Sequence, residues 1–313
     1  MDNVILITGV SGFLGRYLAQ YLANKEHNVV GVDIVSPENS PSHFLKKYLS
    51  VKLPDPSFIQ LIKEIKPTIC IHCAGRASVN ASMLDPYNDY IQGPELTFYI
   101  LNYLHEIVPK CKVLFLSSAA VYGNPSTLPI QESFTPSPIS IYGFNKWQSE
   151  IICREFYDIY KQPTASLRVF SAYGPGLRRQ VIWDICQKAL HEKKVCLHGT
   201  GNESRDFIHV FDIAKAIENV IKSAEFNGEA YNLGSGRQIE ISYIANLVFD
   251  YMNLKNIVLN FSNIEPAGNP INWQADIHKI SQLGFSPIIP FEEGLQSYVN
   301  WFLSEWGKDK LFD

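Results

Sequence analysis

A tyrosine and a lysine four residues apart form a pair whose types and spacing suit acid–base catalysis. Tyr142 and Lys146 lie in segment 141–160, which is predicted to be a long helix, so both side chains would share one helix face. A nearby ammonium stabilises a phenolate and lowers the tyrosine pKa from about 10 towards neutral pH. The pair could then exchange a proton with an alcohol that is oxidised to a ketone. Such pairs are also common on exposed helices, so the assignment depends on the surrounding sequence.

A glycine-rich segment near the N-terminus predicts a dinucleotide site. It follows an apolar strand over 4–8, precedes a helix and reads Thr8-Gly9-Val10-Ser11-Gly12-Phe13-Leu14-Gly15; the next strand, 27–33, ends at Asp33. Gly9 permits the tight turn, Gly12 lets the backbone approach a pyrophosphate, and Gly15 lets the helix pack closely on the sheet. Asp33 can accept hydrogen bonds from the adenosine ribose and would repel a 2′-phosphate. NAD is therefore expected as the cofactor rather than NADP.

Strands and helices alternate through the first half of the chain. Further strands are predicted over 67–73, 112–116 and 165–170, with helices over 58–65, 96–107 and 141–160. This order predicts an α/β fold with a Rossmann-type doubly wound parallel sheet and a smaller C-terminal lobe. The expected Rossmann domain spans 1–170 and takes in about 207–235, while 171–206 and 236–313 form the lobe. Segment 171–176 is expected to be a loop, and Asp212 is expected to cap a helix over 213–224.

Composition excludes several other classes of protein. The chain has 313 residues, 46% of them hydrophobic, which is enough for a large core, and its formal charge of -4 disfavours nucleic acid as a partner. It contains no apolar run near the roughly 20 residues of a membrane span and begins directly with a strand, so a soluble cytoplasmic protein is expected. Cys70 and Cys73 have C-x-x-C spacing, but within a strand they would point to opposite faces. They are interpreted as packing residues, and no metal site is expected.

Seven sequence features, taken together, resemble one enzyme family. They are T-G-V-S-G-F-L-G (8–15), Asp33, H-C-A-G (72–75), S-S-A-A-V-Y-G (117–123), Y-G-F-N-K (142–146), R-V-F-S-A-Y-G-P (168–175) and R-D-F-I-H-V-F-D (205–212). Their order and spacing are similar to those of the extended short-chain dehydrogenase/reductases, specifically the nucleotide-sugar epimerase/dehydratase group that includes UDP-glucose 4-epimerase-like enzymes. The resemblance implies NAD-dependent oxidoreduction at C4 of a nucleotide-diphosphate sugar, with 4-epimerisation through a 4-keto intermediate as the favoured reaction.

The resemblance also assigns roles to particular residues. Tyr142 would be the acid/base, Lys146 would lower its pKa and hold the nicotinamide ribose, and Ser118 would bind the reacting sugar hydroxyl. The implied cofactor contacts are Gly9, Gly12, Phe13, Leu14, Gly15, Asp33, Ile34, Leu53, Ala74, Gly75, Tyr142, Lys146 and Phe170. The implied substrate contacts are Ser118, Tyr142, Ser171, Gln180 and Arg205. The fork of the Arg205 guanidinium suits a pyrophosphate, although an ion pair with Glu203 or Asp206 is the alternative interpretation.

One departure from the family pattern argues against one of the family's reactions, the elimination of water. Sugar dehydratases of this group carry an Asp-Glu pair after the active-site hydroxyl, whereas Ser118 is followed by Ala119 and Ala120. A 4,6-dehydratase is therefore not expected. A nucleotide-sugar 4-dehydrogenase or 4-keto-sugar reductase would use the same residues and remains an alternative, as does a non-catalytic dinucleotide-binding regulator. Similar enzymes form homodimers through the helices that correspond to 96–107 and 141–160, and the same is expected here.

Overall fold

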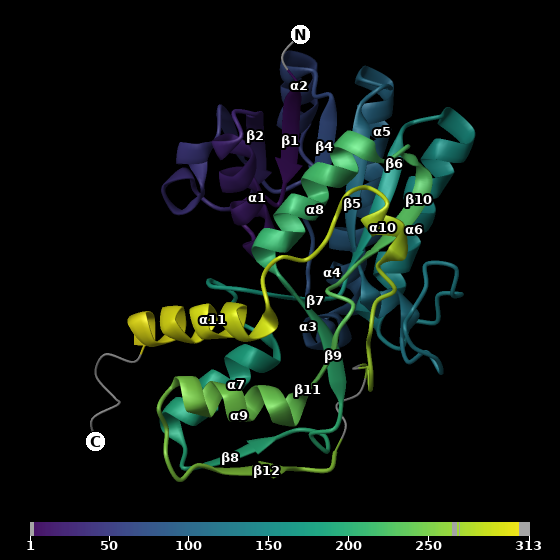
Figure 1. Cartoon of the computed structure of the whole chain (residues 1–313). Coiled ribbons are helices and arrows are strands. Elements are labelled where there is room, and N and C mark those ends of the chain that lie inside the picture. The colour runs from purple at the N-terminus through teal and green to yellow at the C-terminus, as the bar shows by residue number, and fades with distance from the viewer. Residues whose placement is uncertain (1–2, 265–267, 269, 307–313) are drawn as a thin grey trace.

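A computed structural model describes residues 3–264, 268 and 270–306. Within this part of the chain, seven parallel strands form the main sheet in the order β3-β2-β1-β4-β5-β6-β10 (Figure 1). The strands are β1 (Val4–Thr8), β2 (Asn28–Asp33), β3 (Lys47–Ser50), β4 (Ile69–His72), β5 (Lys112–Ser118), β6 (Thr164–Val169) and β10 (Asn227–Leu233). The predicted Rossmann-type parallel sheet is confirmed.

Helices cover both faces of this sheet. Ile5 and Ile7 of β1 face a core shared with α1 (Phe13–Asn24) and α8 (Val210–Ser223), whereas Leu6 faces α2 (Pro56–Ile65), α5 (Leu96–Ile107) and α6 (Ile141–Tyr160). Successive strand residues point to opposite faces, so a strand buried on both sides must be apolar throughout. Cys70 packs with the second of these cores and Cys73 against the first. The two sulfurs therefore lie on opposite sides of the sheet.

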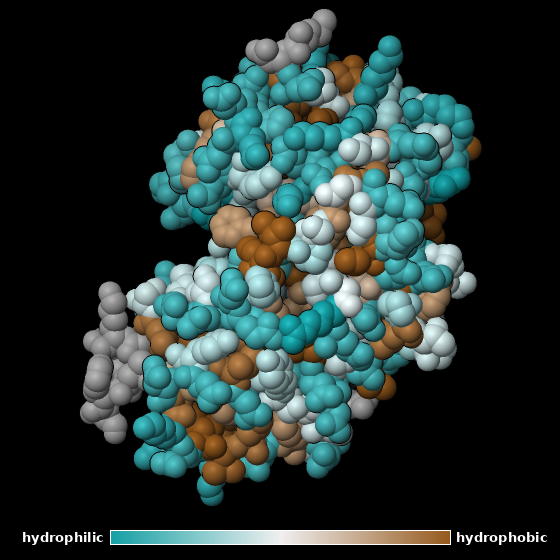
Figure 2. All heavy atoms as spheres, in the orientation of Figure 1, coloured by the Kyte–Doolittle hydropathy of each residue, from teal (hydrophilic) through white to brown (hydrophobic). Residues whose placement is uncertain are grey.

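A smaller lobe lies beyond the carboxyl ends of the main strands, in the lower half of Figure 1. It contains α7 (Gln180–His191), α9 (Ile241–Tyr251) and α11 (Phe291–Trp306), a sheet of β11 (Gln238–Glu240), β9 (Ser204–His209) and β7 (Ser171–Tyr173), and the pair β12 (Val258–Phe261) and β8 (Lys194–Leu197). Its own core includes Tyr173, Ile185 and Tyr298. Figure 2 shows a notch between the two parts of the molecule.

Two local predictions were wrong. Residues 171–173 were expected in a loop but form β7, because they pair in parallel with 207–209 of β9, a contact between distant segments. Asp212 does not cap α8, which begins at Val210 with His209 as its cap. The Asp212 carboxylate instead accepts hydrogen bonds from the backbone N–H groups of Ile288 and Ile289, both at 3.1 Å. It thus joins α8 to the segment that leads into α11.

The approach to α5 contains helical turns of unusual geometry. Helices α3 (Val79–Leu84) and α4 (Pro86–Tyr90) are followed by a π-helical turn, Ile91–Glu95, with Pro94 inside it. Proline has no N–H to donate to the helical ladder, and π turns occur often at functional sites. Among the described residues, no helix has the length and apolar composition needed to cross a membrane.

Candidate active site

The glycine-rich turn between β1 and α1 lies directly against the turn after β4. Gly9 has φ +70°, and a Cβ built there would lie 2.5 Å from the backbone nitrogen of Ala74. A Cβ at Gly15 would collide with the backbone of Gly9 and Val10. Gly12 is exposed at the start of α1 and has no side-chain cap, so this helix end can receive a phosphate. The turn has the shape of a pyrophosphate cradle.

Asp33 is held at the carboxyl end of β2, beside this cradle. Its Oδ2 accepts a hydrogen bond from the Ser11 N–H at 2.8 Å, and its Oδ1 accepts one from the Ile34 N–H at 2.7 Å. The Ile34 side chain is 70% exposed, and Leu53 packs at the edge of the neighbouring core. The carboxylate thus joins the glycine-rich turn to the residue that follows β2. These residues fit the adenosine half of NAD.

Gly9→Ala should abolish NAD binding, because both the backbone conformation and the space at this position exclude a side chain. The strained φ alone costs about 1–3 kcal/mol, and the new Cβ would push the turn away from Ala74. Gly176→Ala is the matched control, because Gly176 has φ +92° but nothing lies within 4 Å of its built Cβ. NAD affinity, measured by calorimetry, should fall only in the first variant. An equal loss of NAD affinity in both variants would show that backbone strain, and not the close approach to Ala74, is responsible.

Tyr142 and Lys146 lie on the first two turns of α6, whose N-terminus Ser140 caps by accepting a hydrogen bond from the Gly143 N–H at 3.1 Å. The Lys146 Nζ donates to the Leu116 carbonyl at 2.7 Å and lies 5.8 Å from the centre of the Tyr142 ring. Burial raises the pKa of Tyr142, while the nearby Ser118 hydroxyl and Arg179 guanidinium lower it. The Tyr142 pKa is raised overall, whereas the sequence predicted that it would be lowered. Desolvation of the phenol outweighs the effects of Ser118 and Arg179.

The other predicted residues of the reaction centre come from strand ends. Ser118 ends β5, is half-buried and caps a short turn by accepting a hydrogen bond from the Ala120 N–H at 3.2 Å. Phe170 follows β6 and packs edge-on against Trp273. Ala74 and Gly75 line a small cavity together with Tyr142 and Lys146. The carboxyl edge of the sheet thus brings the glycine turns and the Tyr–Lys pair to one place.

Besides Ser118 and Tyr142, the predicted substrate residues lie on the smaller lobe. Ser171 opens β7 and is half-buried; Gln180 opens α7, is exposed and has a φ of +70°. Arg205 on β9 donates to the carbonyls of Ser204 and Ile271 at 2.8 and 2.9 Å, and its guanidinium lies 5.8 Å from the centre of the Trp273 ring.

The alternative interpretation of Arg205, a surface ion pair, does not match these contacts. Glu203 instead accepts hydrogen bonds from the N–H groups of Thr200 and Gly201, and Asp206 from those of Ser235, Gly236 and Ala275. Within the described residues, Arg205 forms no ion pair with either acid. Burial lowers the pKa of Arg205 to about 10, and Glu203 opposes this shift. The guanidinium is therefore available to an anionic ligand.

Arg179, which the sequence did not indicate as a candidate, lies near Tyr142. It precedes α7 in extended backbone, and its guanidinium is close enough to Tyr142 to lower the phenol pKa. The adjacent Arg178 points elsewhere and pairs with Glu305 at 2.7 Å. The sequence of two consecutive arginines gave no indication of which one lies near Tyr142. Only the fold separates the surface pair from the site residue.

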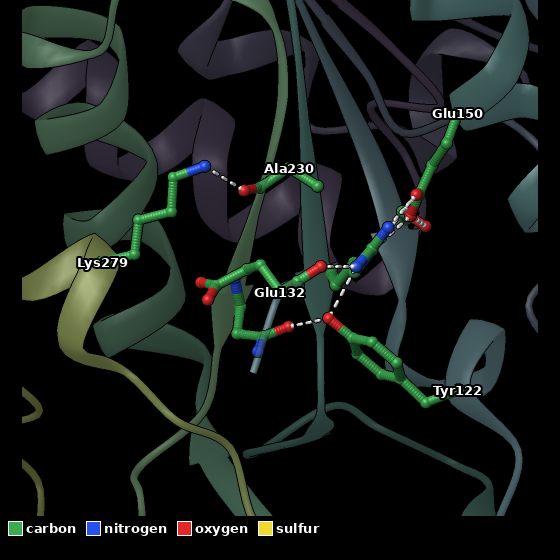
Figure 3. A network of polar contacts seen from close by, with 8 residues as sticks. Tyr122, Glu132, Glu150, Ala230 and Lys279 are labelled. Carbon is green, nitrogen blue, oxygen red and sulfur yellow. Dashed lines mark hydrogen bonds and ion pairs between the residues drawn. The ribbon is translucent and has the colours of Figure 1, made fainter. Parts of the chain in front are cut away.

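A buried polar network holds α6 next to the main sheet (Figure 3). Glu150, one turn after Lys146, binds the Arg168 guanidinium of β6 with both carboxylate oxygens at 2.7–3.1 Å. Arg168 also donates to the Tyr122 hydroxyl at 2.7 Å, which in turn donates to Asn232 of β10 at 2.7 Å. Ser117, next to Ser118, donates to Glu150 as well. The network ties the helix that carries Tyr142 to the strand that carries Ser118.

Comparison with known proteins agrees with this geometry. Residues 5–234 match the NAD dependent epimerase/dehydratase family, which is most of the chain. The chain belongs to this family. An uncharacterised UDP-glucose epimerase of Bacillus subtilis is 28% identical, over 96% of this chain and 98% of its own. NAD is thus the cofactor of this epimerase/dehydratase family member, and the glycine-rich turn and Asp33 fit it.

Solved structures extend the similarity of this family member over nearly its whole length. The UDP-glucose 4-epimerase of Thermotoga maritima with UDP-glucose has a TM-score of 0.87 at 25% identity, covering 96% of this chain and 99% of its own. The UDP-glucuronic acid 4-epimerase of Bacillus cereus, with UDP-glucuronic acid and NAD, has a TM-score of 0.88 at 25% identity, covering 97% and 100%. Among the described residues, no group of His, Cys, Asp and Glu side chains is placed to hold a metal ion.

Proposed function

We propose that this family member is an NAD-dependent 4-epimerase of a nucleotide-diphosphate sugar. The observation that carries the proposal is the placement of Ser118, Tyr142 and Lys146 at one sheet edge, beside the NAD cradle. Ala119 and Ala120, which follow Ser118, are buried and carry no acid or base. Elimination of water would need such groups, whereas exchange of a hydride and a proton at one carbon does not.

Ser118, Tyr142 and Lys146 each have a separate role in the proposed reaction. NAD supplies the hydride acceptor and donor when bound. Ser118 hydrogen-bonds the C4 hydroxyl, and Tyr142 as phenolate removes its proton as the C4–H bond breaks to give the 4-keto sugar. Lys146 holds the nicotinamide ribose and stabilises the phenolate. After the sugar turns in the site, Tyr142 returns the proton to the oxygen and the hydride returns to the opposite face of C4. No net oxidation results.

Two arginines would hold the anionic parts of the substrate. The Arg205 guanidinium suits the pyrophosphate, which accepts paired hydrogen bonds from a planar fork. Arg179 brings a second positive charge near Tyr142, where it would stabilise the phenolate and favour a sugar with a negatively charged substituent. Ser171 and Gln180 would contact the nucleotide part. The candidate substrates should therefore include nucleotides that carry neutral sugars and nucleotides that carry acidic sugars.

The alternatives make different predictions for purified protein. An epimerase regenerates its cofactor, so NAD should be released when the protein is denatured, and UDP-, GDP-, dTDP- or CDP-sugars should give C4 epimers without accumulation of NADH. A 4-dehydrogenase would accumulate NADH and the keto sugar, and a 4-keto-sugar reductase would consume NADH. A non-catalytic regulator would bind the dinucleotide and convert none of these sugars. Any of these last three results would overturn the proposal.

A homodimer through α5 and α6 is part of the same proposal. Several large apolar side chains on these helices are exposed, Phe98 at 46% and Ile151 at 49%, and such surfaces often bind a partner. Phe156 is instead buried, and Tyr99 donates a hydrogen bond to the Asp55 carbonyl at 2.8 Å. These two residues support α5 and α6 from within the monomer.

The expected result in sedimentation at micromolar concentration is a dimer that becomes a monomer in the double variant Phe98→Glu/Ile151→Glu. Charged side chains at a buried apolar interface would lack partners and prevent association. Ile288→Glu, at another exposed apolar residue, is the control and should leave the dimer intact. A wild-type monomer at this concentration would contradict the interface.

A further inference from the structure

Lys146 is a positive charge in a poorly solvated place. Its Nζ donates to the Leu116 carbonyl at 2.7 Å and lies 4.7 Å from the centre of the Phe115 ring. Burial lowers the pKa of Lys146 to about 8, and several acidic groups oppose this shift. In the proposed function the side chain must stay protonated to hold the ribose and stabilise the phenolate. A desolvated ammonium needs a nearby negative charge for this.

Most titratable groups around Lys146 cannot supply that charge. Glu150, one turn further along α6, is neutralised by Arg168, which binds both of its oxygens. The thiols of Cys73 and Cys153 have raised pKa values because they are buried, so they stay neutral. His72 of β4 is also neutral, since burial lowers its pKa to about 3. Tyr142 is the group whose phenolate Lys146 would stabilise, so it is not the countercharge. Arg179, near Tyr142, is itself a cation.

Asp89 on α4 is the remaining acid. It is 3% exposed; its Oδ2 accepts a hydrogen bond from the Asn145 amide at 2.8 Å, and its Oδ1 has no hydrogen-bond partner among the described residues. With Lys146 and Tyr142 it lines a cavity of about 10 Å³, room for about one water molecule. Burial raises the pKa of Asp89, and the Asn145 hydrogen bond and the charges of Arg76 and Lys146 oppose this shift. Arg76 lines the same cavity but pairs with Asp85 at 3.2 Å. The Asp89 carboxylate, with one oxygen unpaired among the described residues, and the Lys146 ammonium thus line the same small cavity.

We propose that Asp89 is the countercharge that keeps the Lys146 side chain protonated in the active site. It acts on the reaction through Lys146, as a positioning residue, and touches neither the sugar nor the reacting atoms. The inference rests on the roles of Tyr142 and Lys146 in the proposed function. Asp89 lies on α4, just before the π-helical turn that leads into α5.

Asp89→Asn tests the inference, because it removes the charge and keeps the shape and an acceptor for Asn145. Loss of the carboxylate removes an attraction that favours the Lys146 ammonium, so the Lys146 pKa should fall. It also removes a repulsion that disfavours the Tyr142 phenolate, so the Tyr142 pKa should fall too. Both limbs of the pH dependence of kcat/KM should therefore move to lower pH, by about one unit.

A second measurement does not depend on turnover. NAD affinity of protein stripped of nucleotide should weaken about fivefold more in Asp89→Asn than in the wild type as pH rises from about 7 to about 9, because Lys146 loses its proton earlier in the variant. Glu95→Gln, at an exposed acid in the same helical run, is the matched control and should behave as wild type. If Asp89→Asn does not fold, Asp89→Ser, which leaves room for water, replaces it.

The inference would be overturned if Asp89→Asn lowered kcat but left the pH dependence of kcat/KM and of NAD affinity unchanged. Asp89 would then have a purely structural role. That result would leave the proposed function intact. Failure of the function itself has a different signature: the wild-type protein would then form no C4 epimer, or Tyr142→Phe would still convert nucleotide sugars.

Discussion

Tyr142→Phe is expected to lower kcat by about 10²- to 10⁴-fold while NAD still binds. The change removes one oxygen atom, and with it the group that takes the C4 hydroxyl proton. Lys146 and Ser118 cannot replace it, because an ammonium has no free electron pair and an unactivated hydroxyl is too weak a base. Single-turnover measurements with a converted nucleotide sugar would show whether the loss lies in the chemical step.

Tyr160→Phe is the control for this prediction. Tyr160 is the last residue of the same helix and is exposed, so removal of its hydroxyl should leave kcat unchanged. Retained NAD binding in Tyr142→Phe would separate a loss of chemistry from a loss of cofactor. Turnover close to wild type in Tyr142→Phe would show that another group exchanges the proton, and the assignment of the reaction centre would fail.

Glu150→Gln should cost about 3–5 kcal/mol in the free energy of unfolding, the second large effect. Both partners of the Glu150–Arg168 pair have side chains that are 8% exposed, so neutralising one leaves the other as an unpaired buried charge. Arg168 would keep its hydrogen bonds to Tyr122 and the Glu132 carbonyl, which are neutral groups. Urea unfolding monitored by circular dichroism measures the difference.

Asp158→Asn provides the comparison on the same helix. Asp158 pairs with Arg154 at 2.7 Å, but both side chains are largely exposed, and such a pair contributes about 0–1 kcal/mol. Glu150→Gln should also lower kcat, because the network fixes α6 relative to β5 and so sets the position of Tyr142 against Ser118 (Figure 3). A loss of stability no larger than that of Asp158→Asn would show that the buried pair is not an anchor.

Local rules were sufficient to predict most of the parallel sheet, although not its edge strand β3, and the glycine-rich turn. The glycine-rich turn, the apolar strand before it and Asp33 are close together in sequence, and each follows from backbone geometry or ribose chemistry. The shared helix face of Tyr142 and Lys146 on α6 also follows from a local rule, the geometry of the helix. The structure places these groups at one edge of the sheet, although their individual roles stay predictions until the variants are measured.

Contacts between distant segments were not predictable in the same way. Residues 171–173 become a strand only because β9 lies beside them. Arg179, just before α7, comes near Tyr142 only through the folding of distant segments. Asp89 belongs to a stretch whose π-helical turn has no simple periodicity. The raised pKa of Tyr142 depends on the degree of burial, which spacing alone does not specify.

The most direct test of the proposed reaction follows the hydrogen at C4. A nucleotide sugar that the protein converts would be prepared with deuterium at C4 and incubated in ordinary water, and the product would be examined by nuclear magnetic resonance. The account predicts a C4 epimer that keeps its deuterium, because the same hydride leaves and returns within one site. A product with hydrogen from solvent at C4, or a 4-keto sugar that accumulates with reduced cofactor, would contradict it.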